Sequence, residues 1–487
     1  MDRGHGFDKK KLVFFEEMRY RPRTVVTGYS RGFYELCARE AMKQKERVAW
    51  AGSMVALLTT AVLLPSSAFA VSLKEAVELA LQNYPTMQQA RYEKQAIQAD
   101  LDTAKARYLP TLDLTAGYGR EWSDNDTTRT DGYGDGRWMN RTESSLRLTE
   151  TLFDGHARTA AVEEQEALLE GAKHYVLDRG DTIGSDVASA YIDVLRYNAV
   201  LELANDNLKT HERILDNVRS RVEAGQSGIG DLQQARARQA SAEARIAEVQ
   251  ADLDKARIKF KKLVGILPDQ VVAPEFDDAV LPPGVEMAVQ RADERSSLIK
   301  RERAKLEAAR ARLKGSAAGK YPTFLLEVGG TANDSLDGTP GRNNDFQAML
   351  RMQMNLFRGG ADSAKERAAA ERYSESMASL AETRRQVEEE VRRAWSSVER
   401  KDQEVEGRQA EVVANGQVSD IYQQEFEMDR RDLLDLLDAE NELFNSRTRL
   451  LAAQHSALYA RFLLLATMGE LVNHLGIDRP ELASSAE

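Results

Sequence analysis

The stretch Leu146-Arg-Leu-Thr-Glu-Thr-Leu-Phe-Asp-Gly155 decides the fold, because a second version of it occurs later in the same chain. That version is Leu350-Arg-Met-Gln-Met-Asn-Leu-Phe-Arg-Gly359, which lies 204 residues further on. The same offset relates three more pairs: Ala190-Tyr191 and Ala394-Trp395, Asp231-Leu232 and Asp435-Leu436, Gly265 and Gly469. Anchors that keep one offset over such a distance indicate an internal duplication. The sequence therefore predicts two related halves.

Each half is predicted to contain one very long helix and a return helix. None of the 11 prolines lies in residues 111–267 or 341–479, so no proline there forces a helix to end. Charged helical stretches run over about 157–223 and 361–427, and a short break follows each of them. The return helices carry apolar or small residues at alternating spacings of three and four, which is typical of coiled-coil packing. We expect two long helical hairpins, with further helices at about 72–107 and 284–317 opening the halves.

Before each long helix, the spacing of the apolar residues changes to the period of two that is typical of β-strands. The clearest case runs from Phe346 to Leu356. With partner segments before them, the strands are predicted to form β-hairpins at about 111–153 and 323–357. One face of each hairpin is apolar and the other polar, although Glu150 interrupts the apolar face. This alternation suits a half-buried soluble sheet as well as a sheet in a membrane.

An apolar segment near the start of the chain favours the membrane. Residues 48–70 follow Lys43, Lys45 and Arg47 and end in Ala68-Phe69-Ala70, which is the three-part pattern of a secretory signal peptide. We predict a leader over 1–70, with the signal peptide at 42–70 and residues 1–41 a misassigned start. The alternative is a retained membrane helix, since about 20 apolar residues can span a bilayer.

Four strands are too few to close a barrel alone. Open sheet edges are not tolerated in lipid, so a chain with membrane strands must associate with further copies. Three copies would supply twelve strands around a water-filled lumen, whereas two would supply eight strands whose interior the side chains would fill.

Composition and motifs exclude several other classes of protein. The formal net charge of −11 disfavours a nucleic-acid partner. The single cysteine, Cys37, excludes a disulfide framework, and the six histidines show no metal-ligand spacing. The stretch Gly315-Ser-Ala-Ala-Gly-Lys-Tyr321 is too short for a phosphate-binding loop. We therefore predict no catalytic residue, no metal site, no cofactor and no enzymatic activity.

A set of local motifs resembles the TolC-like outer-membrane exit ducts over residues 71–475. The motifs are Ser72-Leu-Lys-Glu-Ala-Val-Glu-Leu-Ala80, Tyr108-Leu-Pro110 and Tyr321-Pro322, Leu-Phe-x-Gly at 152–155 and 356–359, Arg431–Leu443, and Ala466-Thr-Met-Gly-Glu-Leu471. The last two look most similar to the branch that serves type I secretion, including adhesin export. The resemblance implies a mainly α protein with a transmembrane β part. Its homotrimer would form a 12-stranded outer-membrane β-barrel that continues as a periplasmic α-helical barrel.

The resemblance also implies partners and site residues. A periplasmic adaptor protein and an inner-membrane ABC transporter would dock at the helical tips, which correspond to Ala224, Gly225, Met428 and Asp429. Acidic rings at the periplasmic aperture fall on Asp435 and Asp438. Closed-state contacts between hairpins fall on Asp231, Arg431 and Phe426, and Phe426 stands where the best-known member of the family has a tyrosine.

We therefore divide the chain into a leader, a first repeat over 71–267, a linker over 268–283, a second repeat over 284–471 and a tail over 472–487. The predicted function is a passive outer-membrane conduit for type I protein secretion, in contact with outer-membrane lipid and a secreted protein or small-molecule cargo. The alternatives are an outer-membrane duct for multidrug efflux and, from another class, a periplasmic adaptor protein.

Overall fold

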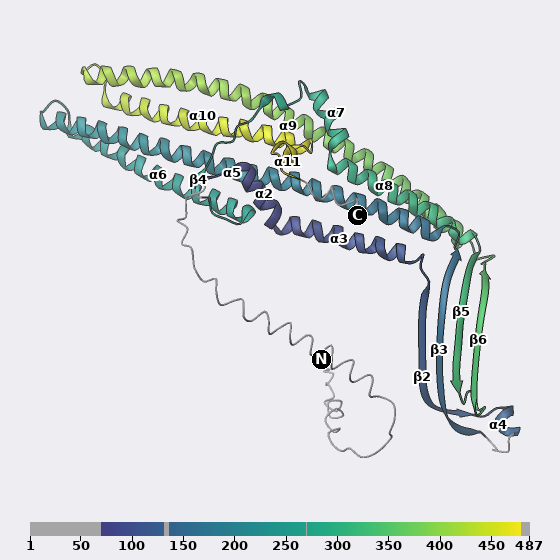
Figure 1. Ribbon diagram of the computed structural model, residues 1–487. Coiled ribbons are helices and arrows are strands. Elements are labelled where there is room, and N and C mark those ends of the chain that lie inside the picture. Colours follow the sequence, from purple (N-terminus) through teal and green to yellow (C-terminus); the bar gives the residue numbers. More distant parts are fainter. Residues whose placement is uncertain (1–69, 131–135, 269, 479–487) are drawn as a thin grey trace, which may run out of the picture. The chain divides into compact units, whose positions relative to one another are not determined.

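The computed structural model describes residues 70–130, 136–268 and 270–478. The predicted leader lies outside these ranges except for Ala70, and so does the end of the predicted tail. In the described part, each half contains two opening helices, a β-hairpin, a helix of 67 residues and a return helix, in the same order (Figure 1). The predicted duplication is confirmed.

The first half contains α2 (Leu73–Asn83), α3 (Pro85–Ala106), β2 (Thr111–Ser123), β3 (Arg137–Phe153), α5 (Ala157–Glu223) and α6 (Ile229–Val264). The second half contains α7 (Val285–Arg295), α8 (Ser297–Ser316), β5 (Thr323–Asp334), β6 (Arg342–Gln353), α9 (Ala361–Glu427) and α10 (Leu433–Thr467). The short elements are β1 (Ala70–Val71), α4 (Asp126–Thr130), β4 (Gln270–Val271), the 3-10 turns η1 (Asp278–Val280) and η2 (Ala317–Lys320), and α11 (Leu471–His474).

The elements differ from the sequence-based expectations at three places. Each of the two predicted opening helices is divided into two. The first is broken at Tyr84, whose extended backbone (ψ 127°) precedes Pro85, and the second at Ser296, whose hydroxyl accepts a hydrogen bond from the Ile299 N–H. A residue before proline is disfavoured in the helical region, which explains the first break. Strand β6 ends at Gln353 rather than near Leu356, because its last partner on β5 is Thr323, and Pro322 has no N–H to extend the ladder.

The four long strands form one antiparallel sheet in the order β2-β3-β5-β6. The register places Leu114 opposite Leu146 and Leu148 opposite Val328, so the apolar side chains share one face. Most charged residues of the strands lie on the other face, where Arg351 forms an ion pair with Glu327 at 3.1 Å. Strands β2 and β6 are each paired on one side only. The sheet therefore combines an exposed apolar face with two open edges.

The helical hairpins α5/α6 and α9/α10 pack against each other, mainly through α5 and α10. The buried positions of the return helices follow the predicted heptads, for instance Ala235, Ala242, Val249, Ala256 and Leu263 on α6, and Leu436, Leu443, Leu450, Ala457 and Leu464 on α10. Both hairpin tips lie at the same end of the helical part, and the sheet leaves from the opposite end (Figure 1).

The largest core lies where the middle of α5 meets α2, α6, α10 and α11. Its centre is Tyr191, which is fully buried. The Tyr191 hydroxyl lies 2.7 Å from the Val71 carbonyl oxygen and accepts a hydrogen bond from the Val272 N–H at 2.9 Å. These bonds hold the parallel pair β1 and β4 against the helices, so Tyr191 joins the start of the described chain to the segment between the two halves.

Candidate functional site at the hairpin tips

The two tips are turns of related geometry with different residues. Helix α5 ends at Glu223 and α9 ends at Glu427. Two residues after each helix, the backbone adopts a positive φ, at Gly225 (73°) and at Asp429 (57°). Glycine occupies this region without strain, whereas a side chain makes it unfavourable. Gly225 and Asp429 are related by the repeat offset of 204, so an aspartate occupies the strained position in the second tip.

Arg221, near the end of α5, binds the second tip in three ways. Its guanidinium forms an ion pair with Asp429, donates a hydrogen bond to the Phe426 carbonyl oxygen at 2.9 Å, and lies over the Phe426 ring at 4.7 Å from the centroid. Its side chain is only 15% exposed. Arg221 therefore connects the end of α5 to the end of α9.

An apolar cluster lies beneath this contact. Side chains of the first hairpin pack against side chains of the second, and the buried members are Leu215, Val218, Ala235, Phe426, Leu433, Leu436 and Leu437. The tips are thus held together by burial of apolar surface, and the charged contacts lie at its edge.

The predicted aperture acids, Asp435 and Asp438, both have basic partners. Asp435 pairs with Arg431, one turn earlier on the second tip, at 3.3 Å. Asp438 instead pairs across the hairpins with Arg238 of α6 at 2.5 Å. In this arrangement neither carboxylate is an unpaired charge.

The structure does not bring the predicted latch residues Asp231 and Arg431 together within the chain. Asp231 accepts hydrogen bonds from the Ser227 hydroxyl and the Gly228 N–H at the start of α6. Arg431 binds Glu425 at 2.8 Å and stacks on Tyr422. The hydrogen bond with Glu425 raises the pKa of Arg431 above its ordinary value.

Phe426 is buried between the tips, whereas the four predicted docking residues are exposed, with Met428 at 55%. The cross-hairpin residues Arg221 and Arg238 were missed in the sequence. The repeat offset gives no signal for these contacts, because Glu425 and Glu442, which are equivalent to Arg221 and Arg238, pair with Arg431 and Arg449 of their own hairpin.

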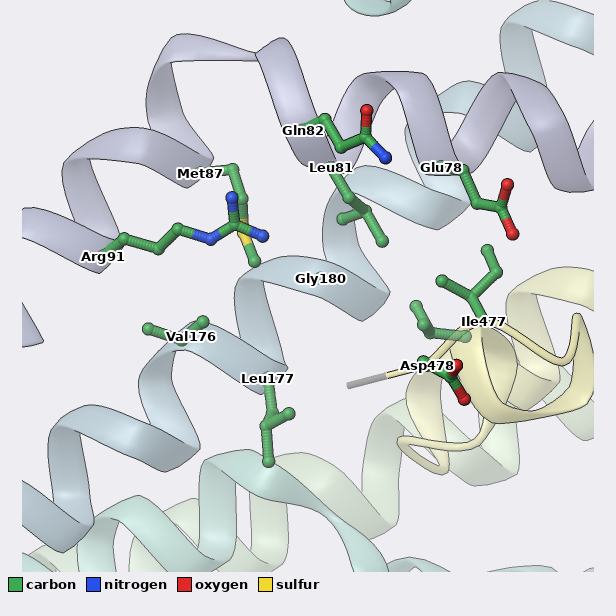
Figure 2. A pocket seen from close by; sticks show the side chains of 11 residues that line it. Glu78, Leu81, Gln82, Met87, Arg91, Val176, Leu177, Gly180, Ile477 and Asp478 are labelled. Carbon is green, nitrogen blue, oxygen red and sulfur yellow. The ribbon is translucent and has the colours of Figure 1, made fainter. Parts of the chain in front are cut away.

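A small cavity elsewhere in the chain has the character of a packing gap. Figure 2 shows α2 and α3 passing over α5 at Gly180, with Leu81, Met87 and Val176 lining the apolar wall. Its volume is about 130 Å³, and its charged lining residues are Glu78, Arg91 and Asp478 (Figure 2). In the part of the chain that the structure describes, no three His, Cys, Asp or Glu side chains are grouped as a metal site requires.

This arrangement of helical hairpins and sheet can be compared with known proteins. The family model described as outer membrane efflux protein matches residues 76–266 and 288–470. The chain belongs to this family. The resemblance to TolC-like exit ducts is confirmed, and so are the mainly α fold with a β part and the function of an outer-membrane exit duct.

Individual relatives align with most of the length of this chain. The outer membrane efflux protein BepC of Brucella suis is 24% identical over 425 residues, which cover 87% of this chain and 91% of BepC. The proteases secretion protein PrtF of Dickeya chrysanthemi is 27% identical over 447 residues, which cover 85% and 92% of the two chains. Both are described as efflux or secretion proteins.

Solved structures agree on the fold. A crystal structure of CusC, which was described together with transmembrane channel formation, matches with a TM-score of 0.71 at 20% identity and covers 81% of this chain and 91% of CusC. None of the helices in the described ranges combines the length and the apolarity needed to cross a bilayer.

Proposed function

We propose that this outer membrane efflux protein is one protomer of a homotrimeric conduit for type I protein secretion. The sheet edges carry this proposal. Strands β2 and β6 each leave one row of backbone groups without a strand partner, and such edges cannot face lipid. Pairing β6 of one copy with β2 of the next closes a barrel of twelve strands.

The side chains of the sheet fit this barrel. Its strands have 12 to 17 residues, and about 9–11 suffice to cross a bilayer. The apolar face would meet lipid, and residues such as Leu112, Leu114, Phe346 and Leu350 on it are 65–76% exposed in the single chain. Trp122 and Trp138 lie together at the loop end of this face, with ring centroids 5.6 Å apart, as in an interfacial aromatic girdle.

The first experiment measures assembly and conduction. Protein extracted from the outer membrane in mild detergent should be trimeric by native mass spectrometry and should form discrete channels in planar bilayers. Replacing Arg342–Gln353 of β6 by a sequence with two prolines should abolish the trimer, because proline cannot donate to the new edge ladder. A monomer that is water-soluble in its native state would contradict the proposal.

The leader and the orientation belong to the same proposal. Cleavage after Ala70 would release a mature chain whose helical part lies in the periplasm. Amino-terminal sequencing of protein from the outer membrane should begin at Val71. A start upstream of Lys43 would contradict the signal peptide and favour the adaptor alternative.

The proposed partners are a periplasmic adaptor and an inner-membrane ABC transporter, which meet the exposed tips at Ala224, Gly225, Met428 and Asp429. A photo-crosslinking residue at 428 should capture the adaptor in cells. The same residue at Tyr118, which lies on the apolar face of the sheet and is 79% exposed, is the control and should capture none.

The relatives support a choice between two kinds of cargo. PrtF, described as a proteases secretion protein, favours protein secretion, and BepC, described as an efflux protein, favours small molecules as the second candidate. Deleting the gene should remove one or a few large proteins from the culture medium and leave drug susceptibility unchanged. The reverse result would assign the chain to drug efflux.

The entrance is proposed to be gated and acidic. A contact between Asp231 and Arg431 of neighbouring hairpins in the trimer would hold the closed state, so Arg431→Ser should raise single-channel conductance. Acids facing the lumen concentrate cations. Asp435→Ala together with Asp438→Ala should therefore weaken cation selectivity, and equal selectivity in the double variant would exclude the aspartate rings.

A further inference from the structure

We propose that Glu150 binds the ammonium headgroup of a membrane lipid of the phosphatidylethanolamine class, at the end of the apolar sheet face that lies nearest the helices. The inference rests on the proposed function, because it needs the sheet to lie in a bilayer. It adds a ligand site on the lipid-facing side of the protein, away from the lumen and from the helical tips.

Glu150 is an acidic residue in an otherwise apolar stretch of the sheet. On β3 it lies between Leu148 and Leu152, and across the ladder it is opposite Leu326 of β5. The other charged strand residues on this face are grouped at the loop end, and they are Arg120, Asp334 and Arg342. Glu150 is therefore isolated from the other charges on its own face of the sheet.

The carboxylate of Glu150 lacks a donor for one of its oxygens. The side chain is half-buried, and its Oε2 atom is shielded from solvent and has no hydrogen-bond partner in the described part of the chain. A carboxylate removed from water without a compensating partner is unfavourable. The strand itself does not require an acid here, because the equivalent residue of the second half is Met354. The acid therefore needs a partner from outside the chain.

The position of Glu150 along β3 matches the far edge of a bilayer. It lies twelve residues after Trp138, which is next to Trp122 at the loop end of the face. At about 3.4 Å per residue and a strand tilt of about 40°, this separation is about 31 Å along the membrane normal, and the hydrocarbon core is about 30 Å thick. Phe153 and Phe324 lie beyond Glu150 with ring centroids 6.4 Å apart, as in a second aromatic girdle.

The surroundings of the carboxylate define the class of ligand. Charge-assisted hydrogen bonds to a carboxylate need a cation with N–H groups, and the leucines on either side need an apolar cover. A primary ammonium has three N–H donors, whereas the quaternary ammonium of a choline lipid has none. A neighbouring copy would add its strands beyond β2 and β6, at least two strand spacings or about 10 Å from β3. The ligand with all these properties is an aminophospholipid.

Native mass spectrometry of the membrane-extracted protein measures the binding. Given phosphatidylethanolamine and phosphatidylcholine with identical acyl chains, wild type should retain about fivefold more of the ethanolamine lipid, the effect of an ion pair of ordinary strength. Glu150→Gln should lose this preference, because it removes the charge and keeps the shape. Glu143→Gln is the matched control and should keep it, because Glu143 lies on the polar face of the same strand and pairs with Arg141. A preference that survives in Glu150→Gln would overturn the site.

Chemical coupling locates the bound lipid. Dicyclohexylcarbodiimide is soluble in lipid and activates a carboxyl group, and a primary amine in contact with that group then forms an amide while the carbodiimide leaves as its urea. Peptide mass spectrometry should find phosphatidylethanolamine joined to Glu150 and absent from Glu143. A Glu150 peptide that carries no lipid, whether or not the carbodiimide has modified it, would overturn the contact.

The same measurements separate this inference from the proposed function, because they count lipid per chain and need no channel. Absence of channels and trimers in wild type would contradict the conduit alone. Equal retention of the two lipids by wild type would overturn the ammonium site alone. Retention of phosphatidylglycerol that depends on Mg²⁺, without a preference for the ethanolamine lipid, would also overturn it and would assign Glu150 to a cation bridge.

Discussion

Helices α5 and α9 have the same length and the same place in the two halves, yet the chain surrounds only one of them. α5 buries 23 residues and α9 only nine. α5 packs against α3, α6, α8 and α10, whereas the main partners of α9 are α7, α8 and α10. A duplicated helix has therefore become the axis of the protomer in one half and a peripheral helix in the other.

The sequences of the two helices explain the difference. α5 carries glycines at its centre, and a Cβ added at Gly184 would lie 3.2 Å from Leu471 of α11. The residue 204 positions later is Glu388, which lies on the surface and binds Arg392. Neighbouring helices of the same chain can pack closely against small residues, whereas packing against a charged residue would bury its charge. The exposed faces of α9 are available for a neighbouring copy.

The largest expected effect is on the free energy of unfolding, when Tyr191 or its repeat equivalent Trp395 is replaced. Tyr191→Ala removes a fully buried ring and its hydrogen bonds to the backbone of Val71 and Val272, so the free energy of unfolding should fall by about 3–5 kcal/mol. Trp395 is half-buried and donates its indole N–H to Glu399, so Trp395→Ala should lower it by about 1–2 kcal/mol. Denaturant unfolding of the helical part, followed by circular dichroism, measures both. Equal losses would show that α9 is as enclosed as α5.

A smaller effect is expected on assembly. Val413 and Ile421 lie two turns apart on α9 and are each 52% exposed, whereas Lys209 and Asn217 occupy the equivalent places on α5. Aspartate at both 413 and 421 should reduce the trimeric fraction about tenfold, because burying a charge in an interface is unfavourable. Lys209→Asp with Asn217→Asp is the control and should leave it unchanged. Native mass spectrometry reads the fractions, and a normal trimer in the α9 variant would leave this face without a covering copy.

Much of this architecture could be predicted because its signals are local or repeated. The absence of proline and the offset of 204 gave bounds for the long helices that the structure reproduces. The heptads identified the buried side of α6 and α10. The break before Pro85 had a visible signal in the proline itself, whereas Ser296 resembles any serine inside a helix until its capping bond is seen.

The tip contacts depended on information that periodicity does not contain. Heptads specify which side of a helix is buried, but the rotation of one hairpin against another decides whether Asp438 meets Arg238 or solvent. The burial of α5 could not be predicted for a similar reason, because Gly184 and Glu388 are equivalent positions of the repeat although their surroundings differ. The repeat likewise treats Arg221 and Glu425 as equivalent positions, yet Arg221 binds Asp429 of the other hairpin and Glu425 binds Arg431 of its own.

The smallest effect expected is a pH dependence confined to α5. His211 is 4% exposed, and burial, with a further contribution from the positive charge of Arg238, lowers its pKa below the ordinary value. As the pH falls, the His211 side chain of the unfolded chain is therefore protonated near pH 6.5, whereas that of the folded chain stays neutral to lower pH. The stability of the tip should fall as the pH drops below that value, by about 1 kcal/mol.

The exchange rates of the tip amides at pH 7.5 and pH 5, corrected for the intrinsic pH dependence of exchange, measure this loss. His211→Gln should flatten the dependence. The equivalent position on α9 is the half-buried Asn415, and Asn415→His should add no comparable sensitivity, because solvent stabilises the protonated ring there. A profile in His211→Gln as steep as in wild type would assign the acid sensitivity to another group and remove this distinction between the two helices.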